Sequence, residues 1–263
     1  MSESHLKKSL CVVCDNDSRH EQAQAFAGEN LLPLLNAKPP DYELQLIFGN
    51  KRIELYDNSL NTSIYVDFVH GALAHRQQFG GGRGQAIAKA VGLKQGKNPS
   101  VLDITAGLAR DAYILTTLGC PLTLVEKSPI LSKLIEDGIA RGLEDEHSAE
   151  VLTEHFELHN QDAIDFMKNL KNDQQPDTIY LDPMYPERKK SALVKKEMQI
   201  LQRLLGKDEN SGELLETALN YAKDRVVVKR PIHAPFLLDK KPATSINSKK
   251  TRFDIYLTHK PKE

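Results

Sequence analysis

From residue 99 onward, short apolar runs alternate with longer segments whose apolar residues recur every three or four positions. The first kind of segment predicts buried strands, and the second predicts amphipathic helices. The strands are expected at 99–107, 121–129, 156–162, 177–186, 224–231 and 252–259, and the helices at 110–119, 130–143, 163–172, 191–205 and 212–222. Such alternation predicts an α/β fold with a mostly parallel sheet and helices on both of its faces.

The chain before residue 71 follows a different pattern. Three segments there alternate apolar and polar residues and are connected by Gly, Asn and Asp turns: 42–48, 52–56 and 63–68. They predict short antiparallel strands. Residues 71–93 have helix-like flanks around three consecutive glycines. We therefore expect a small α+β extension over residues 1–70 and a main domain over residues 71–263.

The composition agrees with a soluble globular protein. Of 263 residues, 40% are hydrophobic and 27% are charged, and no apolar run approaches the roughly 20 residues that span a bilayer. The apolar run near the N-terminus is too short for a secretory signal, and three cysteines, an odd number, argue against a disulfide framework. We expect a cytoplasmic protein without a membrane segment. Cys11 and Cys14 have no second cysteine pair, so we expect no metal site.

The charge is distributed unevenly along the chain. Residues 1–182 hold 17 Lys and Arg against 26 Asp and Glu, whereas residues 183–263 hold 18 against 10. A basic half favours a polyanionic partner such as nucleic acid, although solvated surface charges give the same pattern. Residues 187–207 alone carry seven Lys and Arg and two Glu.

Polar residues at the ends of the predicted strands are the candidates for a ligand site, because ligands bind at this edge of a doubly wound sheet. The first strand runs into a small turn that contains Asp103, Ala106 and Gly107. This turn has one glycine where a dinucleotide-binding fingerprint has three. Taken alone, it fits an ordinary strand–helix turn as well as it fits a ligand site. Glu126 follows the second strand, 23 residues after Asp103, where a carboxylate accepts hydrogen bonds from ribose hydroxyls. Together these features favour a nucleoside-containing cofactor.

The third strand ends near Gln161 and Asp162. Polar side chains at this position can bind an adenine edge, and Asp162 can equally cap the helix that begins at Ala163. Both roles are compatible with each other.

The fourth strand ends in Asp182-Pro183-Met184-Tyr185, which a dehydrogenase does not require. An amine on a nucleobase is a poor nucleophile that must be oriented toward an electrophile. The Asp182 carboxylate and the Pro183 carbonyl can accept its two N–H groups, and Tyr185 can stack on the base. The motif therefore favours methylation of an exocyclic amine, with these three residues in catalytic roles.

Five blocks of the chain are distinctive: "HRQQFGGGRGQAIAKAVG", "LDITAGLARDAYILTTLGC", "YLDPMYPERKKSALVKKEM", "RVVVKRP" and "RFDIY". With these blocks the sequence resembles the class I S-adenosylmethionine-dependent methyltransferases, and more narrowly the ribosomal RNA small subunit methyltransferase J family. The resemblance implies a Rossmann-like fold with a seven-stranded sheet and methylation of the N2 amine of a guanine in 16S rRNA. It also implies S-adenosylmethionine contacts at Arg110, Asp111, Glu126, Lys127, Gln161, Asp162 and Asp182. Ala109 departs from the family, where we expect glycine.

Several basic residues are candidates for RNA contacts. Arg83 lies in a glycine-rich segment that lacks the Lys-Ser/Thr of a phosphate loop; we interpret the segment as a lid before the first core strand. The other candidates are Arg188, Lys189 and Lys190 after the Asp182 motif, and Lys229 and Arg230 at a strand end. Cations at these places are suited to backbone phosphate, and we expect recognition by shape and charge.

Alternatives remain at this stage. The residue types also fit methylation of adenine N6 or of a protein amide, and only the resemblance favours guanine. A nicotinamide-dependent oxidoreductase shares the glycine turn and Glu126, and a non-catalytic RNA-binding protein shares the charge pattern. The sequence does not choose between naked rRNA and an assembled 30S subunit as the partner, and it leaves the oligomeric state open.

Overall fold

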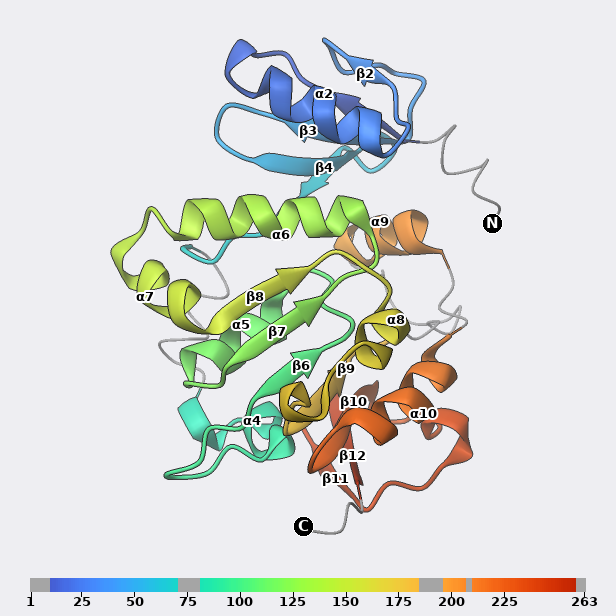
Figure 1. Cartoon of the computed structure of the whole chain (residues 1–263). Helices are drawn as coiled ribbons and strands as arrows, with labels where there is room; N and C mark the ends of the chain where they lie inside the picture. Colours follow the sequence, from blue (N-terminus) through green and yellow to red (C-terminus); the bar gives the residue numbers. More distant parts are fainter. Residues whose placement is uncertain (1–9, 71–80, 185–195, 207–209, 259–263) are drawn as a thin grey trace. The chain divides into compact units, whose positions relative to one another are not determined.

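The computed structural model describes residues 10–70, 81–184, 196–206 and 210–258 (Figure 1). The chain forms two compact units that are interleaved along the sequence. The first unit contains Met1–Val66, Pro129–Arg141 and Pro186–Lys207, and the second contains the remaining segments. The division predicted from the sequence, an extension over residues 1–70 and a main domain over residues 71–263, stays a prediction.

The second unit is built on a seven-stranded sheet with the order β11-β12-β10-β9-β6-β7-β8. Its strands are β6 (Val101–Asp103), β7 (Leu122–Val125), β8 (Phe156–His159), β9 (Thr178–Leu181), β10 (Arg225–Pro231), β11 (Thr244–Asn247) and β12 (Thr251–Leu257). Neighbours from β8 to β10 are parallel, and β12 is antiparallel to both β10 and β11. This topology confirms the predicted Rossmann-like, mostly parallel sheet. The order reverses between β6 and β9, which is where such folds place their ligand.

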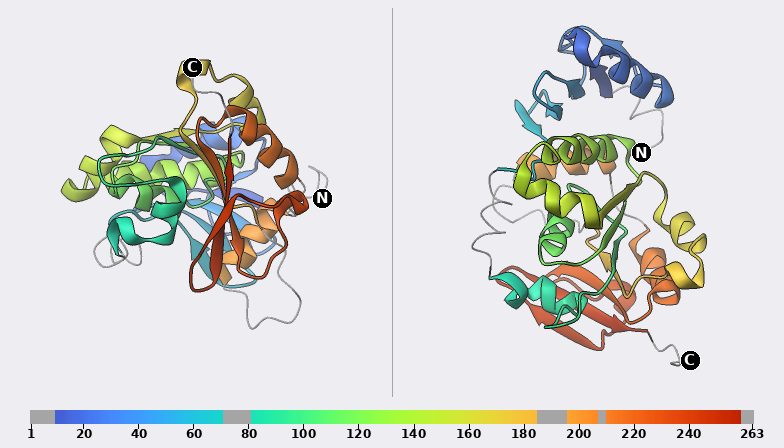
Figure 2. Two further views of the ribbon diagram at one scale, coloured as in Figure 1. Left: turned by 90° about the horizontal axis from the view of Figure 1, so that it is seen from below. Right: turned by 60° about the vertical axis from the view of Figure 1, so that its left-hand side comes forward.

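Helices cover both faces of this sheet (Figures 1 and 2). Their bounds are α4 (Ala86–Val91), α5 (Arg110–Thr117), α7 (Glu146–His155), α8 (Ala163–Lys168) and α10 (Ser211–Tyr221), with short 3-10 turns η2 (Gly82–Gly84), η3 (Asn172–Gln174) and η4 (Leu237–Asp239). Apolar residues of α8 and α10, such as Met167 and Leu215, pack with Ile179 and Val228 of the sheet in one buried cluster. α4 and α5 contact each other on the opposite face. Because helices pack against both apolar faces of the sheet, the ends of its strands are held at fixed positions.

The first unit contains a five-stranded sheet with the order β2-β1-β3-β4-β5. Its elements are β1 (Leu10–Val13), η1 (Asp17–Arg19), α2 (His20–Glu29), β2 (Leu34–Leu35), β3 (Leu44–Phe48), β4 (Ile53–Asp57), β5 (Thr62–Ile64), α6 (Pro129–Gly142) and α9 (Lys196–Leu205). The pairs β3–β4 and β4–β5 are antiparallel, as predicted. α9 is tied to this sheet because Arg203 Nη1 lies 2.6 Å from Oδ2 of Asp57, whose side chain is fully buried. The helix predicted over 191–205 is described only from Lys196.

Among the described α-helices and β-strands, four were not anticipated from the sequence: α2, β2, α7 and β11. β11 has the polar sequence Thr-Ser-Ile-Asn and lies at the edge of its sheet, so it has no apolar face to reveal it. α7 begins at a capping residue, Asp145, whose side chain accepts a hydrogen bond from Ser148 N. Among the described residues, no helix has the length and apolar character needed to cross a bilayer.

Candidate active site

The turn after β6 is held to the end of β7 by one carboxylate. Oε2 of Glu126 accepts a hydrogen bond from Gly107 N, and Oε1 accepts one from Ser128 N, each at 2.8 Å. Gly107 has φ +58° and Ala109 has φ +55°, so two left-handed residues bend the chain before α5 begins at Arg110. Glu126 therefore fixes the turn and at the same time places its own carboxylate at the strand end where it was predicted.

Asp103 ends β6 beneath this turn and is only 3% exposed. Its Oδ1 accepts a hydrogen bond from Thr105 N at 3.0 Å. Burial raises the pKa of Asp103 to about 7, and the carboxylates of Asp111, Asp182 and Glu126 add to that rise. The group therefore changes its protonation state near neutral pH, and a positive ligand would favour its charged form.

Lys229 lies between two of these carboxylates. Its Nζ is 2.7 Å from Oδ2 of Asp111, at the start of α5, and 2.7 Å from Oδ2 of Asp182, directly after β9. The hydroxyl of Tyr180 donates a further hydrogen bond to Asp111 Oδ2 at 2.8 Å. Burial opposes the charge on Lys229, but Asp182 and Asp111 outweigh it and raise the pKa of Lys229 above its ordinary value. The structure thus places Lys229 in an ion-pair network within the site, where the sequence suggested a phosphate contact.

Asp182 faces solvent in spite of this pairing. Its side chain is 41% exposed, and its backbone N donates to Thr105 Oγ1 at 2.7 Å. Within the described residues, Lys229 binds Oδ2 and no hydrogen bond to Oδ1 is found. Pro183 is buried beside it. The strand end therefore presents one anchored oxygen and one oxygen that can accept from a ligand.

The end of β8 approaches the end of β7 through side-chain contacts. Asn160 Nδ2 donates to the carbonyl of Glu126 at 2.7 Å, and Lys127 Nζ lies 3.0 Å from Asp162 Oδ2. Asp162 also caps α8, since its Oδ1 accepts from Ile164 N at 2.9 Å. The capping role proposed for Asp162 is therefore present, and its exposed neighbour Gln161 keeps its predicted place at the same strand end.

Two other predicted contacts lie away from this cluster. The guanidinium of Arg83 donates to the carbonyl of Lys94 at 2.7 Å and to Asn98 Oδ1 at 2.8 Å. Both acceptors precede β6, so Arg83 ties its glycine-rich segment to the chain ahead of the first core strand, and its contact with phosphate stays a prediction. Arg230 is 6% exposed and donates to the carbonyl of Pro235 at 3.2 Å. Tyr185, Arg188, Lys189 and Lys190 lie outside the described residues.

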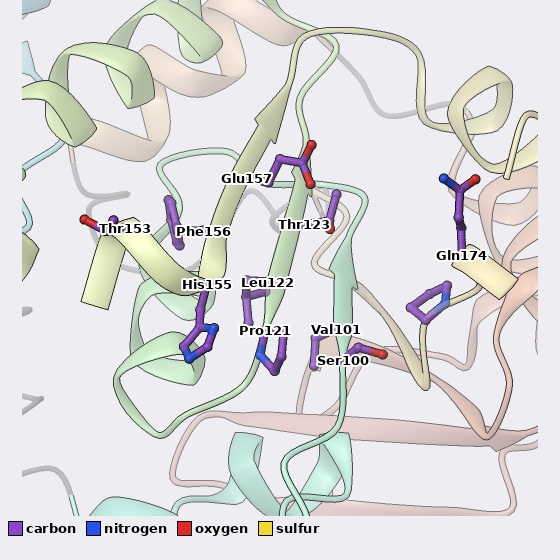
Figure 3. A pocket seen from close by; sticks show the side chains of 11 residues that line it. Ser100, Val101, Pro121, Leu122, Thr123, Thr153, His155, Phe156, Glu157 and Gln174 are labelled. Carbon is purple, nitrogen blue, oxygen red and sulfur yellow. The ribbon is translucent and has the colours of Figure 1, made fainter. Parts of the chain in front are cut away.

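A separate hollow of about 450 Å³ lies at the amino edge (Figure 3). Ser100, Pro121 and His155 at the starts of β6, β7 and β8 are among the residues that line it. Because ligands of such sheets bind at the carboxyl edge, this hollow is not the active site. No cluster of three or more His, Cys, Asp or Glu suited to a metal is found in the described parts of the chain.

The chain is similar to a family of known enzymes. Residues 32–258 match the family model described as "Putative SAM-dependent methyltransferase". Ribosomal RNA small subunit methyltransferase J of Nitrosococcus oceani is 50% identical over 229 residues, which cover 87% of this chain and 89% of the relative. The protein of the same name from Aeromonas salmonicida is 45% identical over 249 residues, covering 94% and 96%.

The chain belongs to the ribosomal RNA small subunit methyltransferase J family. A crystal structure of a SAM-dependent methyltransferase from Neisseria gonorrhoeae superimposes with a TM-score of 0.75 at 32% identity, covering 95% of this chain and 97% of that one. Membership confirms the predicted fold and the predicted enzyme class, with S-adenosylmethionine as cofactor, and excludes the nicotinamide-dependent alternative.

The residues at the strand ends suit this cofactor chemically. S-adenosylmethionine carries a sulfonium and an ammonium against one carboxylate, so its net charge is positive. Four carboxylates lie at these strand ends and at the start of α5, those of Asp103, Asp111, Glu126 and Asp182, with Lys229 between two of them. Each Glu126 oxygen accepts one backbone N–H and keeps a second lone pair for a ribose hydroxyl. The left-handed Gly107 turn allows a ligand to lie close to the backbone.

Proposed function

We propose that this protein transfers the methyl group of S-adenosylmethionine to the N2 amine of a guanine in small-subunit ribosomal RNA. The proposal rests on one observation above all: the exposed Asp182 carboxylate, bound through one oxygen by Lys229, lies at the end of β9, at the same sheet edge as the residues that we propose hold the cofactor. The names of the relatives support ribosomal RNA of the small subunit as the substrate.

The residues of the turn and of the β7 and β8 ends would hold the cofactor. Glu126 accepts from the ribose hydroxyls, Gln161 and Asp162 face the adenine, and Asp103 with Asp111 offsets the positive charge of the methionine portion. When bound, the cofactor supplies a methyl group made electrophilic by the sulfonium. Three further residues lie next to the proposed cofactor contacts. Arg110 begins α5, Lys127 comes two residues before α6, and Ala106 lies in the turn after β6.

Asp182 and Pro183 would orient the acceptor amine. Oδ1 of Asp182 and the carbonyl of Pro183 accept its two N–H groups, which aligns the nitrogen lone pair with the methyl carbon. As the N–C bond forms and the C–S bond breaks, positive charge develops on the nitrogen, and the Asp182 carboxylate stabilises it. The amine proton then leaves toward Asp182 or water.

Lys229 has a positioning role in this scheme. Its contact with Asp182 Oδ2 at 2.7 Å would restrict the carboxylate to one orientation and leave Oδ1 available to the amine. Partial desolvation of the Asp182 carboxylate by the groups around it, although the side chain is 41% exposed, and the nearby Asp111 carboxylate raise the pKa of Asp182, and the Lys229 ammonium offsets part of that rise. Lys229 therefore keeps more of Asp182 in the ionised form that accepts from an amine.

The guanine has to leave its base stack to reach this strand end, and Tyr185 is proposed as its stacking partner. The basic residues Arg188, Lys189 and Lys190 are proposed contacts of the RNA backbone, with either naked rRNA or the assembled 30S subunit as substrate. This substrate implies action in the cytoplasm and requires no metal.

Transfer of a labelled methyl group to unmodified small-subunit rRNA and to 30S subunits, followed by nucleoside analysis, tests the proposal. N2-methylguanosine as the labelled product is the expected result. Label in N6-methyladenosine would establish the adenine alternative instead, and absence of transfer to both substrates, with the cofactor shown to bind, would refute the proposed function.

A further inference from the structure

The carboxyl edge of the second unit's sheet extends beyond the active site to β10 and β12, where its charge reverses. Residues 229–252 carry seven Lys and Arg against a single acidic residue, Asp239. Pro231 at the end of β10 pairs with Thr251 at the start of β12, so the turn between β11 and β12 lies at the same edge as Asp182. β12 is two strands from β9, roughly 10 Å at ordinary strand spacing.

The loop after β10 displays an aromatic ring at this edge. Phe236 is 36% exposed, and the guanidinium carbon of Arg252 lies 4.7 Å from its ring centroid. The remaining contacts of Arg252 fix that guanidinium, since Nε donates to Asp254 Oδ1 at 2.8 Å and Nη1 donates to the Ile232 carbonyl at 2.9 Å. Nη2 is buried without a hydrogen-bond partner in the described chain. The Arg252 guanidinium therefore packs against one face of the Phe236 ring and holds the ring in place.

The same loop is held in a defined conformation. Leu238 and Asp239 both have left-handed backbones, with φ of +54° and +53°. Leu238 fits against Gly212 of α10, where an added Cβ would lie 2.6 Å from a Leu238 methyl. Leu237 is buried, and the Lys240 carbonyl accepts a hydrogen bond from the Tyr256 hydroxyl at 3.0 Å. Two successive residues with strained backbones, stabilised by packing, indicate that this loop holds Phe236 in a defined position at the surface.

Two lysines complete this surface. Lys249 and Lys250 occupy the turn between β11 and β12 and are exposed, and neither forms an ion pair with any described residue. An ordinary solvated surface would intersperse acidic residues among such cations. Here the exposed aromatic ring and the lysines lie at the same sheet edge as the base-orienting motif, with β10 between β12 and the strand β9 that carries the motif.

We propose that Phe236, Lys249 and Lys250 form a second RNA-contacting surface, which binds the rRNA strand next to the target guanine. The lysines contact backbone phosphates, and Phe236, supported by Arg252, stacks on an unpaired flanking base. Single-stranded RNA is bound by this combination of cations and aromatic platforms. The inference rests on the proposed function, because it assigns this surface to the same substrate.

Binding of an unmodified small-subunit RNA fragment, measured across a range of salt concentrations, tests the lysines. The double variant Lys249→Ala/Lys250→Ala should weaken binding at low salt and reduce the slope of log affinity against log salt by about 1 to 2. The matched control, Lys89→Ala/Lys94→Ala, removes two exposed lysines from the amino edge and should bind RNA as the wild type does. An unchanged slope in the first variant would overturn the proposal.

Phe236 is tested separately, with folding monitored by thermal denaturation. Phe236→Leu keeps an apolar side chain and removes the ring face, and it should weaken RNA binding about 5-fold or more with an unchanged salt slope. Phe236→Tyr should retain affinity. If Phe236→Leu binds RNA as tightly as the wild type, the stacking role is excluded.

A failure of this second RNA-contacting surface can be distinguished from a failure of the proposed function. Wild-type transfer to rRNA with normal RNA binding by both surface variants would reject this surface and leave the function intact. Variants that bind naked RNA normally but lose binding to 30S subunits would assign the surface to a ribosomal protein, which also contradicts the proposal. Each variant should keep wild-type affinity for S-adenosylhomocysteine.

Discussion

Two stretches of one sheet edge differ in charge and in construction. At the ends of β6, β7 and β9, carboxylates predominate and are buried or paired, as in Asp103, Glu126 and Asp182. At the ends of β10 and β12, cations predominate, and Lys249 and Lys250 are exposed. The acidic stretch suits a cofactor with net positive charge, and the basic stretch suits a polyanion.

Lys229 marks the boundary between the two stretches. It belongs to β10 by sequence, yet its ammonium is directed to Asp111 and Asp182 on the acidic side. Its neighbour Arg230 alternates to the other face of the sheet, as successive residues of a strand do. The role of a cation at this edge therefore depends on its position along the edge and not on the charge of its neighbours in the sequence.

The largest expected effect comes from removing the acceptor at the boundary. Asp182→Ala should lower the rate of methyl transfer about 10²- to 10³-fold, because the amine loses the group that orients it and stabilises its developing charge. Asp182→Asn keeps one acceptor oxygen and should retain more activity. Single-turnover transfer from labelled cofactor measures both, with Asp165→Ala, an exposed position on α8, as control. Wild-type rates in Asp182→Ala would remove this residue from the mechanism.

Lys229→Met should have the next largest effect. It leaves two adjacent carboxylates without their cation, and we expect a loss of stability of about 2 kcal/mol, a value reduced for partial exposure of the pair. The pKa of Asp182 should rise further, so the acid limb of the pH–rate profile should shift to higher pH. Denaturant unfolding and pH–rate profiles measure the two effects.

A matched variant separates charge from packing at this position. Lys229→Met/Asp111→Asn removes one of the two carboxylates and should restore much of the lost stability. The exposed Lys223→Met should leave both the stability and the pH profile unchanged. An acid limb that stays in place in Lys229→Met would show that Lys229 does not tune Asp182.

Asp103 gives the acidic stretch a pH dependence. With its pKa near 7, cofactor affinity should increase up to about tenfold as pH rises from 6 to 8, since the cation favours the ionised group. The native pKa of Asp103 lies above its ordinary 3.8, so its contribution to stability is present at low pH and is lost as pH rises through about 7. In Asp103→Asn both dependences should flatten. Calorimetric titration with S-adenosylmethionine, which carries the sulfonium, and unfolding curves at several pH values provide the test; an equally steep affinity profile in the variant would exclude Asp103.

The smallest expected effect concerns the backbone of the cofactor turn. Gly107→Ala should cost about 1 kcal/mol of stability, because alanine is strained in the left-handed region, and should weaken cofactor binding about tenfold by crowding the turn. Gly96 is a matched control, because its φ is +77° and nothing lies within 4 Å of an added Cβ. Gly96→Ala should lose similar stability without losing cofactor affinity. Equal cofactor affinities in the two variants would contradict a close approach of the ligand to Gly107.

The sequence predicted the sheet well because parallel strands buried on both faces appear as continuous apolar runs. The strand-end residues Glu126, Asp162 and Asp182 follow from the same rule, since the carboxyl end of each strand marks its position at the edge. The left-handed φ of +55° at Ala109 explains physically why glycine was expected there.

Other features could not be predicted from the sequence. The ion pairs of Lys229 depend on register between β9 and β10, and the anchoring of Arg83 depends on contacts to segments 11 and 15 residues away. The inclusion of α6 and α9 in the first unit depends on tertiary packing, for example the pairing of Arg203 with Asp57 across 146 residues. Strand periodicity and local charge carry no information on such distant partners.

One paired binding measurement tests the division of the edge most directly: the affinities of S-adenosylhomocysteine and of unmodified small-subunit RNA, each determined for Gly107→Ala and for Lys249→Ala/Lys250→Ala. We expect the first variant to lose affinity for S-adenosylhomocysteine alone and the second to lose affinity for RNA alone. If both variants lose affinity for both ligands to the same degree, or if the lysine variant loses affinity for S-adenosylhomocysteine alone, the two stretches do not serve separate ligands.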